Sequence, residues 1–539
     1  MAEITLWRTR SIFPLFSNRS ALLATKRPLL LLILASCVAA ASSFEPIRVD
    51  GGLISGTPSP QWSYGIRVFR GLPYAAPPVG NLRWRPPQPV VPWQGVKEAD
   101  RYAPSCMQAP TAKDSNAWQD GLTPVSEDCL YLNIWTPAKS ANDNLAVMVF
   151  IPGGGNIRGS ASELQYDGNN LAKKGVVYVS INYRLGVFGF LAHPYLTGES
   201  EHHASGNYAL QDQIAALQWI QRNIAKFGGN PNNVMLFGHS AGASNLAALM
   251  ASPLATGLFH RALGQSGGLG NQAPLAQSEE AGVKFAELVG AHSISQLRAK
   301  TAEEILNAGR IVNAPIVDGW VLPDNVYNIF AAGKQIDVPL IAGSVGDDGP
   351  GAGMPTKASE VAGWARENYG ALADELLKSF PADSDTEAIK ASHDLRRDRS
   401  LVGARTWLAL HAQAGRSKAY WYLFNHASPM PPGAMFSGRP AVEMGSYHGG
   451  ELVYVWNNLN LKDWPWTAAD RNLGELLSTL WTTFAKTGDP NGPGLAKWPA
   501  YDATKEMLFY ITTDGKPQPP PYGQQLDFLS KAAAAARNH

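Results

Sequence analysis

The stretch Val234-Met235-Leu236-Phe237-Gly238-His239-Ser240-Ala241-Gly242 decides the fold of this chain. Its first four residues are apolar and predict a buried strand, and the small and apolar residues of 243–250 predict a helix. Between them, Gly-x-Ser-x-Gly is the pattern of a nucleophile elbow, a sharp turn that lifts a serine hydroxyl above a sheet. The helix N-terminus behind the turn supplies backbone N–H groups to developing negative charge. Ser240 is therefore the candidate nucleophile.

Further apolar runs surround this stretch. Residues 147–151, 176–181 and 339–342 predict strands with no polar face, and residues 210–224 predict a helix. Strands that are apolar on both faces need helices on both sides of their sheet. The predicted fold class is therefore α/β, with a central, mostly parallel sheet flanked by helices.

Length and composition favour one large folded unit. The chain has 539 residues, of which 45% are hydrophobic and 17% charged, so it can bury a core and is not disordered. Residues 270–315 and 352–440 look mainly helical until the strand-like run 420–424, and they predict helical insertions over the active site. We expect residues 42–539 to form a single domain.

The balance of charges excludes one class of partner. Lys and Arg total 45 and Asp and Glu total 44, with no basic cluster in the main body, so nucleic acid is not an expected partner. We expect no cofactor and no metal, since no dinucleotide-binding glycine motif and no zinc spacing occur. His202-His203 with Glu199 and Glu201 fits a solvated loop better than a metal site. The sequence carries no sign of an oligomeric state.

The N-terminus has the layout of an export signal in residues 1–41. A basic segment is followed by the apolar run 29–34 and then by small residues. The run is too short to span a bilayer, which takes ~20 residues, and no later stretch is long enough. Ala39-Ala40-Ala41 predicts cleavage after residue 41 and a secreted or periplasmic protein. Leu34-Ala35-Ser36-Cys37 is the alternative, because it resembles a lipobox that would place a membrane anchor on Cys37.

Either cleavage leaves Cys106 and Cys129 in the mature chain, since Cys37 is either removed or lipidated. An even count in an exported protein favours one disulfide, and the alternative is two buried thiols. In the chain-entropy model a bridge across this spacing stabilises the fold by about 3 kcal/mol.

A second stretch, Gly264-Gln265-Ser266-Gly267-Gly268, has the same Gly-x-Ser-x-Gly pattern. The run before it is a plausible short strand, but residues 269–274 after it look like a loop. No helix N-terminus then lies behind Ser266, so we interpret Ser266 as structural and retain Ser240 as the nucleophile.

A serine that attacks acyl groups needs a base, an acid and oxyanion donors. Pro152-Gly153-Gly154-Gly155 follows a predicted strand, and its N–H groups can point at a ligand together with that of Ala241. Asp347-Asp348 follows the strand at 339–342, where functional side chains of such sheets lie. His448 lies in a glycine-bracketed loop and is the candidate base. The order serine, acid, histidine is that of α/β-hydrolases.

Other histidines are weaker candidates for the base. His239 neighbours the nucleophile, and we expect its ring to point away from the position of the base. His393-Asp394 falls in a predicted helical insertion and is expected at the surface.

Two long motifs resemble the signatures of the type-B carboxylesterase family, which includes cholinesterases, bile-salt lipases and bacterial carboxylesterases. One is residues 227–242, and the other is Glu127-Asp128-Cys129-Leu130-Tyr131-Leu132-Asn133-Ile134-Trp135-Thr136-Pro137. Similar segments run from about 49 to 499. The resemblance implies an α/β-hydrolase fold, a Cys106–Cys129 disulfide, and a serine carboxylic-ester hydrolase that forms an acyl-enzyme and needs no cofactor. The implied site residues are Ser240, Asp348 and His448, with Gly154, Gly155 and Ala241 as oxyanion donors.

The chain departs from the family pattern at four places. Asp348 replaces the usual Glu, and its neighbour Asp347 is disfavoured because strand alternation would turn it away. Pro152 and Asn156 replace a His or Tyr and an aromatic residue, which would polarise or widen the acyl side of the pocket. His239 replaces the Glu of cholinesterases and disfavours that activity.

The expected substrates are small to medium esters, including aromatic ones. Trp118, Phe188, Trp320 and Tyr447 suit an aromatic ester, although core packing explains each equally well in a chain with 16 Trp. A lipase or a hydrolase of lactones or toxin esters is the alternative. A non-catalytic adhesion module is disfavoured because all three catalytic residue types are present.

Overall fold

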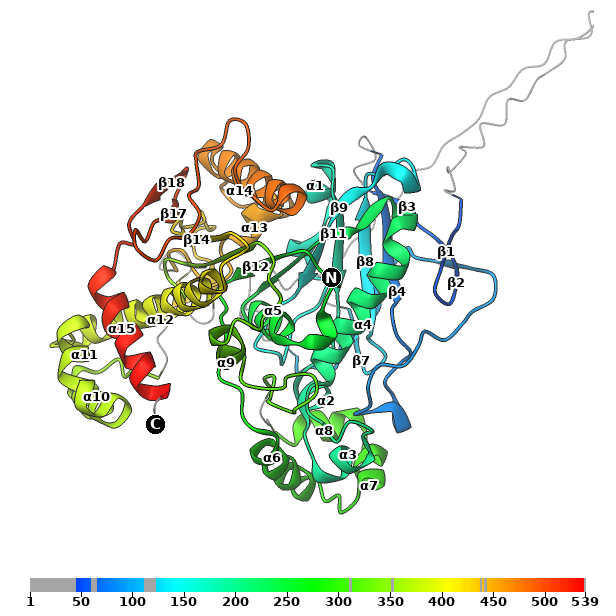
Figure 1. Cartoon of the computed structure of the whole chain (residues 1–539), viewed down its shortest axis with the longest axis horizontal. Coiled ribbons are helices and arrows are strands. Elements are labelled where there is room, and N and C mark those ends of the chain that lie inside the picture. Colours follow the sequence, from blue (N-terminus) through cyan, green and yellow to red (C-terminus); the bar gives the residue numbers. More distant parts are fainter. Residues whose placement is uncertain are drawn as a thin grey trace, which may run out of the picture. The chain divides into compact units, whose positions relative to one another are not determined.

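The structure is a computed structural model, and Figure 1 shows its fold. The residues it describes are 45–59, 65–110, 123–309, 313–349, 353–436, 439–440 and 444–537. Residues 44–539 form one unit, separate from residues 1–43. The predicted export signal at 1–41, the alternative anchor Cys37, and Trp118 lie outside the described residues.

An eleven-stranded sheet runs through the unit in the order β18-β17-β14-β13-β12-β11-β9-β10-β8-β4-β3. The strands from β17 to β10 pair in parallel, and antiparallel strands complete both edges. The mostly parallel sheet is therefore confirmed. The strands are β3 (Thr57–Pro58), β4 (Arg67–Pro73), β8 (Tyr131–Thr136), β9 (Leu145–Ile151), β10 (Val177–Ile181), β11 (Gly229–His239), β12 (Arg261–Gln265), β13 (Leu340–Val345), β14 (Ala419–Phe424), β17 (Leu508–Ile511) and β18 (Gly515–Gln518).

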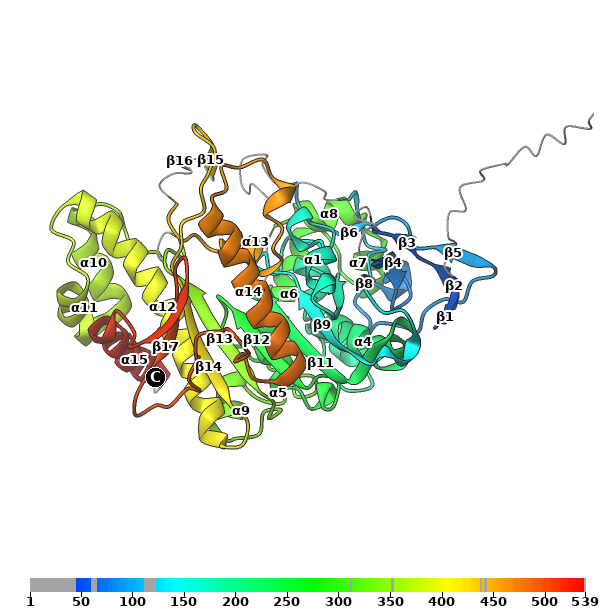
Figure 2. The same ribbon diagram turned by 90° about the horizontal axis from the view of Figure 1, so that it is seen from above.

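Helices cover both faces of this sheet, as the apolar strands require. In β9, Val147 and Val149 pack into one apolar core, while Met148 and Phe150 pack into a second core on the opposite face. The first core is closed by α4 (Tyr208–Asn223), α5 (Ala241–Ala251) and α12 (Asp385–Ala414). The second is closed by α13 (Leu452–Val455) and α14 (Ala468–Thr487). Figure 2 shows α14 crossing one face of the sheet.

The first helical insertion lies between β12 and β13. It contains α6 (Leu275–Leu288), α7 (Ile294–Ala299) and α8 (Ala302–Asn307), and α9 (Val326–Ala331) follows. The three insertion helices share a small apolar core with α2 (Gly186–Phe190) and α3 (Pro194–Glu199). Phe188 belongs to this core and is buried in it, so its role is packing.

The second helical segment is shorter than the predicted range 352–440. It contains α10 (Ala358–Tyr369), α11 (Ala373–Ser379) and α12, and it ends at Ala414. The rest of the range includes β14, a strand of the central sheet that pairs with β13 and β17. Figures 1 and 2 show α10, α11 and the final helix α15 (Gly523–Arg537) beside α12.

Small elements complete the described chain. Cys106 and Cys129 form the disulfide that the sequence favoured. None of the helices in the described ranges combines the length and the apolar character needed to cross a bilayer. The remaining elements are β1 (Ile47–Val49), β2 (Gly52–Ser55), β5 (Val96–Glu98), β6 (Ser105–Cys106), β7 (Val125–Ser126), α1 (Asn169–Lys173), β15 (Met435–Phe436) and β16 (Arg439–Pro440).

Candidate active site

Ser240 occupies the tight turn between β11 and α5. Its backbone has φ 55° and ψ −123°, a conformation that a non-glycine residue rarely adopts. Its N–H donates to the carbonyl of Gln265 at 2.7 Å. A Cβ on Gly238 would lie 2.5 Å from the carbonyl of Gly242, and one on Gly242 would lie 2.1 Å from the carbonyl oxygen of Ile151. Both glycines of the motif are therefore required by close backbone approach.

The glycine loop after β9 passes directly over this turn. A Cβ on Gly153 would lie 3.1 Å from the Cβ of Ser240. Gly154 and Gly155 have φ values of 108° and 63°, and their N–H groups donate no hydrogen bond to the described residues. Ala241, the third predicted donor, is the first residue of α5. Free N–H groups beside a serine are what an oxyanion hole needs.

The predicted acid and base lie in contact. The Nδ1 of His448 hydrogen-bonds Oδ1 of Asp348, whose side chain is only 1% exposed just beyond the end of β13. The side chain of His448 is 30% exposed. Asp347 points elsewhere, as strand alternation predicts, and its Oδ1 lies 2.9 Å from Nδ1 of His393. His393, which we expected at the surface, has a side chain that is 19% exposed and contacts the acid loop through Asp347.

His239 connects the base to the turn that carries Ser240. The rings of His239 and His448 have centroids 4.6 Å apart. A Cβ on Gly449 would lie 3.2 Å from Cε1 of His239, and a Cβ on Gly153 would lie 3.0 Å from its Nδ1. The ring therefore sits between the glycine loop and the loop of His448. The expectation that it points away is wrong, because the loop of His448 folds back onto the end of β11.

The two histidines differ in their protonation. Burial lowers the pKa of His448, but the carboxylate of Asp348 outweighs burial, and the net pKa is raised. Burial and the positive charge of His448 together hold the pKa of His239 well below its usual value. The Nε2 of His239 is buried without a hydrogen-bond partner among the described residues. Of the two histidines, His448 is therefore the one suited to accept a proton, and the imidazole of His239 beside it is neutral.

Gln265 and Glu451 support this arrangement, although the sequence did not reveal it. The carbonyl of Gln265 holds the N–H of Ser240, and its Nε2 donates to Oε1 of Glu451 at 3.1 Å. Glu451 is buried three residues after His448, and burial raises its pKa to about 7. Gln265 thus ties the turn of Ser240 to the loop of the base. The signal in the sequence is the second Gly-x-Ser-x-Gly stretch, which contains Gln265.

Ser266 occupies a similar turn after β12 but has no helix behind it. Its φ is 50°, and its N–H donates to the carbonyl of Gly343 at 2.8 Å. The following residues form a loop until α6 begins at Leu275, as predicted. This turn lacks the helix N-terminus that lies behind Ser240.

Both helical segments reach the site. Nδ2 of Asn313, which follows α8, donates to the carbonyl of Gly155 at 3.2 Å. On α12, Nε of Arg396 lies 3.6 Å from Oδ2 of Asp348, and the Arg396 side chain is 43% exposed. The insertions therefore brace the glycine loop and the acid from outside.

Two departures from the family pattern act behind the glycine loop. Asn156 is buried, and its Oδ1 accepts hydrogen bonds from Asn245 at 2.9 Å and from Tyr183 at 3.3 Å. The hydroxyl of Tyr183 also donates to the carbonyl of Pro152 at 2.8 Å. Asn156 therefore holds the loop against α5.

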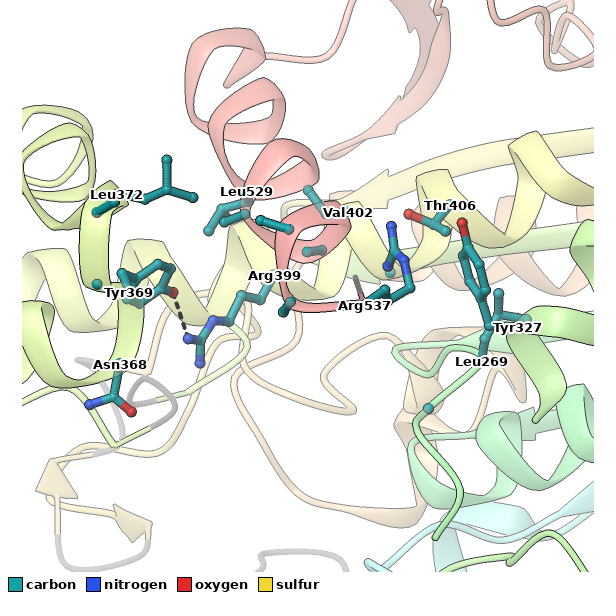
Figure 3. Close-up of a pocket in the computed structure, with 18 residues that line it drawn as sticks. Leu269, Tyr327, Asn368, Tyr369, Leu372, Arg399, Val402, Thr406, Leu529 and Arg537 are labelled. Atoms are coloured by element: carbon teal, nitrogen blue, oxygen red, sulfur yellow. Dashed lines mark hydrogen bonds between the residues drawn. The ribbon is translucent and has the colours of Figure 1, made fainter. Parts of the chain in front are cut away.

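The other candidate residues lie outside this arrangement. His202 is exposed and stacks on Trp320 with ring centroids 3.8 Å apart. Tyr447, next to the base, is buried. Within the described ranges, no group of three His, Cys, Asp or Glu side chains could hold a metal ion. A cavity of about 700 Å³ lies along α12 and α15, and Ser240 is not among the residues that line it (Figure 3).

The strand order and the elbow between β11 and α5 place the chain in the class of α/β-hydrolases. Comparison with known proteins identifies the family within this class. A match to the Carboxylesterase family covers residues 44–529, so the chain belongs to this family and is a carboxylic-ester hydrolase.

Individual relatives agree. The fumonisin B1 esterase of Sphingopyxis macrogoltabida is 37% identical over 468 residues, which is 83% of each chain. The cocaine esterase of Homo sapiens is 34% identical over 484 residues, covering 82% of this chain and 83% of the human one. A solved structure of a PNB esterase matches with a TM-score of 0.74 and 29% identity over 90% of this chain and 99% of its own.

Proposed function

We propose that this esterase works through an acyl-enzyme intermediate with Ser240 as nucleophile, His448 as base and Asp348 as the acid that orients the base. One observation carries the assignment. The His448–Asp348 pair packs, through the ring of His239, against the same turn that holds Ser240 in its strained conformation. No other described serine combines such a turn with a helix N-terminus and a neighbouring imidazole.

In the proposed mechanism, acylation begins at Ser240. Nε2 of His448 takes the hydroxyl proton of Ser240 as Oγ attacks the ester carbonyl carbon. The N–H groups of Gly154, Gly155 and Ala241 bind the carbonyl oxygen as it becomes negative. Asp348 fixes the imidazole with its proton on Nδ1 and stabilises the imidazolium. When the tetrahedral intermediate collapses, the bond to the alcohol breaks and His448 returns the proton to the leaving alkoxide.

Deacylation repeats these roles with water. His448 removes a proton from a water molecule, the hydroxide adds to the acyl carbon, and the bond to Oγ of Ser240 breaks. The proton returns to Oγ, and the carboxylic acid leaves. No group beyond the chain and water is needed for the proton balance.

The proposed substrates are small to medium carboxylic esters, including aromatic ones. A second candidate is a toxin ester, because the relative of 37% identity over 83% of both chains is named a fumonisin B1 esterase. Assaying fumonisin B1 beside p-nitrophenyl esters of increasing acyl length distinguishes the two. Turnover of fumonisin B1 at a higher kcat/KM than any p-nitrophenyl ester would favour the second.

The test of the catalytic assignment uses the two serines of the same motif. Ser240→Ala should lower kcat for p-nitrophenyl acetate by about 10⁴-fold or more. Ser266→Ala is the matched control and should retain activity within a few-fold. An organophosphate should add to the peptide containing Ser240 and to no other, as read by mass spectrometry. Retained turnover in Ser240→Ala would refute the assignment.

We further propose that the protein is exported, with cleavage after Ala41. The basic, apolar and small segments of residues 1–41 and the Cys106–Cys129 disulfide support this. Intact mass of the protein from its native host tests it. A chain that begins at residue 42 supports cleavage, whereas a diacylated chain that begins at Cys37 identifies a lipoprotein. A chain that retains residue 1 contradicts export by this route.

A further inference from the structure

The structure has a cavity of about 700 Å³ whose lining includes none of the residues of the proposed mechanism. It is bounded by α12, α15, the turn η7 (Gly370–Leu372) and Leu269-Gly270 of the loop after β12. Figure 3 shows the labelled side chains, which come from these segments and from α9 and α10. Ligand sites in proteins typically measure ~300–1,000 Å³, so the space suits a small molecule.

The walls of this cavity are mostly apolar. Leu269, Val402 and Leu529 line it and are buried. Four alanines of α15 at positions 532, 533, 535 and 536 form one side, and Gly403 of α12 lies among the lining residues. Such small side chains leave room between the two helices. The walls would accept an alkyl or aryl body.

The charge on the walls is one-sided. Arg399 and Arg537 line the cavity, whereas none of the described lining residues is acidic. Neither arginine has a carboxylate partner among the described residues. Arg405, a neighbour on α12, differs, because it pairs with Glu506 at 2.7 Å and Asp527 at 2.9 Å. Within the described part of the chain, the two guanidinium groups therefore stand beside apolar walls without a carboxylate partner.

Tyrosines hold both guanidinium groups. Nη2 of Arg399 donates to the hydroxyl of Tyr369 at 2.6 Å, drawn as a dashed line in Figure 3. The Arg537 guanidinium lies over the ring of Tyr327, 4.3 Å from its centroid. A guanidinium fixed in this way loses little entropy when it binds an anion. Arg399 is half-buried and Arg537 exposed, so Arg399 offers the less hydrated cation.

We propose that this cavity binds an amphiphilic carboxylate, that is, a carboxylic acid with an alkyl or aryl body of the kind that ester hydrolysis releases. Its carboxylate would pair with Arg399, assisted by Arg537, and its apolar body would lie along the alanines of α15. Guanidinium and carboxylate make paired, charge-assisted hydrogen bonds, which sets the anion preference. Binding involves no covalent step and does not depend on the role of Ser240.

The first experiment measures decanoate binding by calorimetry to the full chain. Arg399→Gln should raise Kd at least tenfold and Arg537→Gln about threefold, with kcat/KM for p-nitrophenyl acetate unchanged within twofold. Arg101→Gln, on an 82% exposed side chain outside the cavity, is the control and should leave Kd unchanged. Decyltrimethylammonium should bind more weakly than decanoate. An unchanged Kd in Arg399→Gln overturns the proposal and assigns decanoate to another site.

The second experiment uses two alanines of one helix. Ala536 lines the cavity and Ala534 does not, although both are exposed near the end of α15. Ala536→Glu places a carboxylate at the cavity and should raise Kd for decanoate at least tenfold, whereas Ala534→Glu should leave it within twofold. Equal weakening in both variants, or none in Ala536→Glu, overturns the proposal. Thermal unfolding of both variants shows whether α15 remains intact.

Discussion

At the scale of single residues, the contact between His239 and the base His448 is the most distinctive feature of this site. Its buried, neutral ring touches the base at a position next to the nucleophile. His239→Glu would place a carboxylate there and stabilise the imidazolium of His448, so it should raise the pKa of His448. The acid limb of kcat/KM should move to higher pH, by about one unit. His239→Gln is neutral and should leave the limb in place, so equal pH profiles of the two variants would contradict this view.

The two neighbouring aspartates provide a second residue test. Asp348→Asn keeps the shape of the side chain but cannot hold the Nδ1 proton of His448, and kcat should fall by about 10⁴-fold. Asp347→Asn alters only the contact with His393 and should cost less than tenfold. Comparable losses in both would mean that the acid loop acts as a unit and that Asp348 has no special role.

Local sequence patterns predicted where the site residues lie, but they did not predict every contact of their side chains. Ser240 and the Asp348–His448 pair could be placed because motifs and strand ends fix where such side chains project. The sequence could not predict the orientation of His239 or the Gln265–Glu451 hydrogen bond. Each depends on which distant loop packs against the end of β11. Contacts between residues 186 positions apart have no signature in a single sequence.

At the scale of elements, replacing an elbow glycine should lower the free energy of unfolding, which can be measured. Gly242→Ala would place a methyl group 2.1 Å from the backbone oxygen of Ile151, which cannot rotate away. We expect a loss of about 3 kcal/mol in the free energy of unfolding, by urea titration. Gly363→Ala in α10 meets open space and should stabilise the protein by up to about 1 kcal/mol. Similar effects of the two changes would show that packing at the elbow is looser than the structure indicates.

The elements themselves were largely predictable. Strands such as β9 and β11 were found because an apolar run long enough to be buried on two faces has few alternatives. The run 420–424 is strand-like in sequence, but its place in the central sheet was not predictable, because 352–440 joins a long helix to this strand. Where one ends and the other begins depends on pairing of β14 with β13 and β17.

At the scale of the whole molecule, the buried Glu451 links stability to pH. Its pKa is about 7 in the folded protein against an ordinary value of 4.5, so unfolding releases a proton between these pH values. The free energy of unfolding should therefore fall as pH rises from 4.5 to 7, by up to about 3 kcal/mol from this residue. Glu451→Gln keeps an acceptor for Gln265 and should reduce this fall. Glu98→Gln on the exposed strand β5 is the control, and equal pH slopes in the two variants would contradict the prediction.

The turns at Ser240 and Ser266 are held in the same way, by a backbone hydrogen bond to the neighbouring strand. The N–H of Ser240 is held by a carbonyl at the end of β12, and that of Ser266 by a carbonyl of β13. The alignment of each strand with its neighbour therefore determines where the reactive hydroxyl stands, regardless of how many residues connect the strands. Changes in length within inserts such as 270–315 need not displace the hydroxyl. Deleting a single residue within β12, by contrast, would place a different carbonyl opposite the N–H of Ser240. Engineers who wish to alter substrate preference should therefore change connecting segments rather than strands, and should keep the residues there, such as Asn313 and Arg396, that contact the glycine loop and the acid.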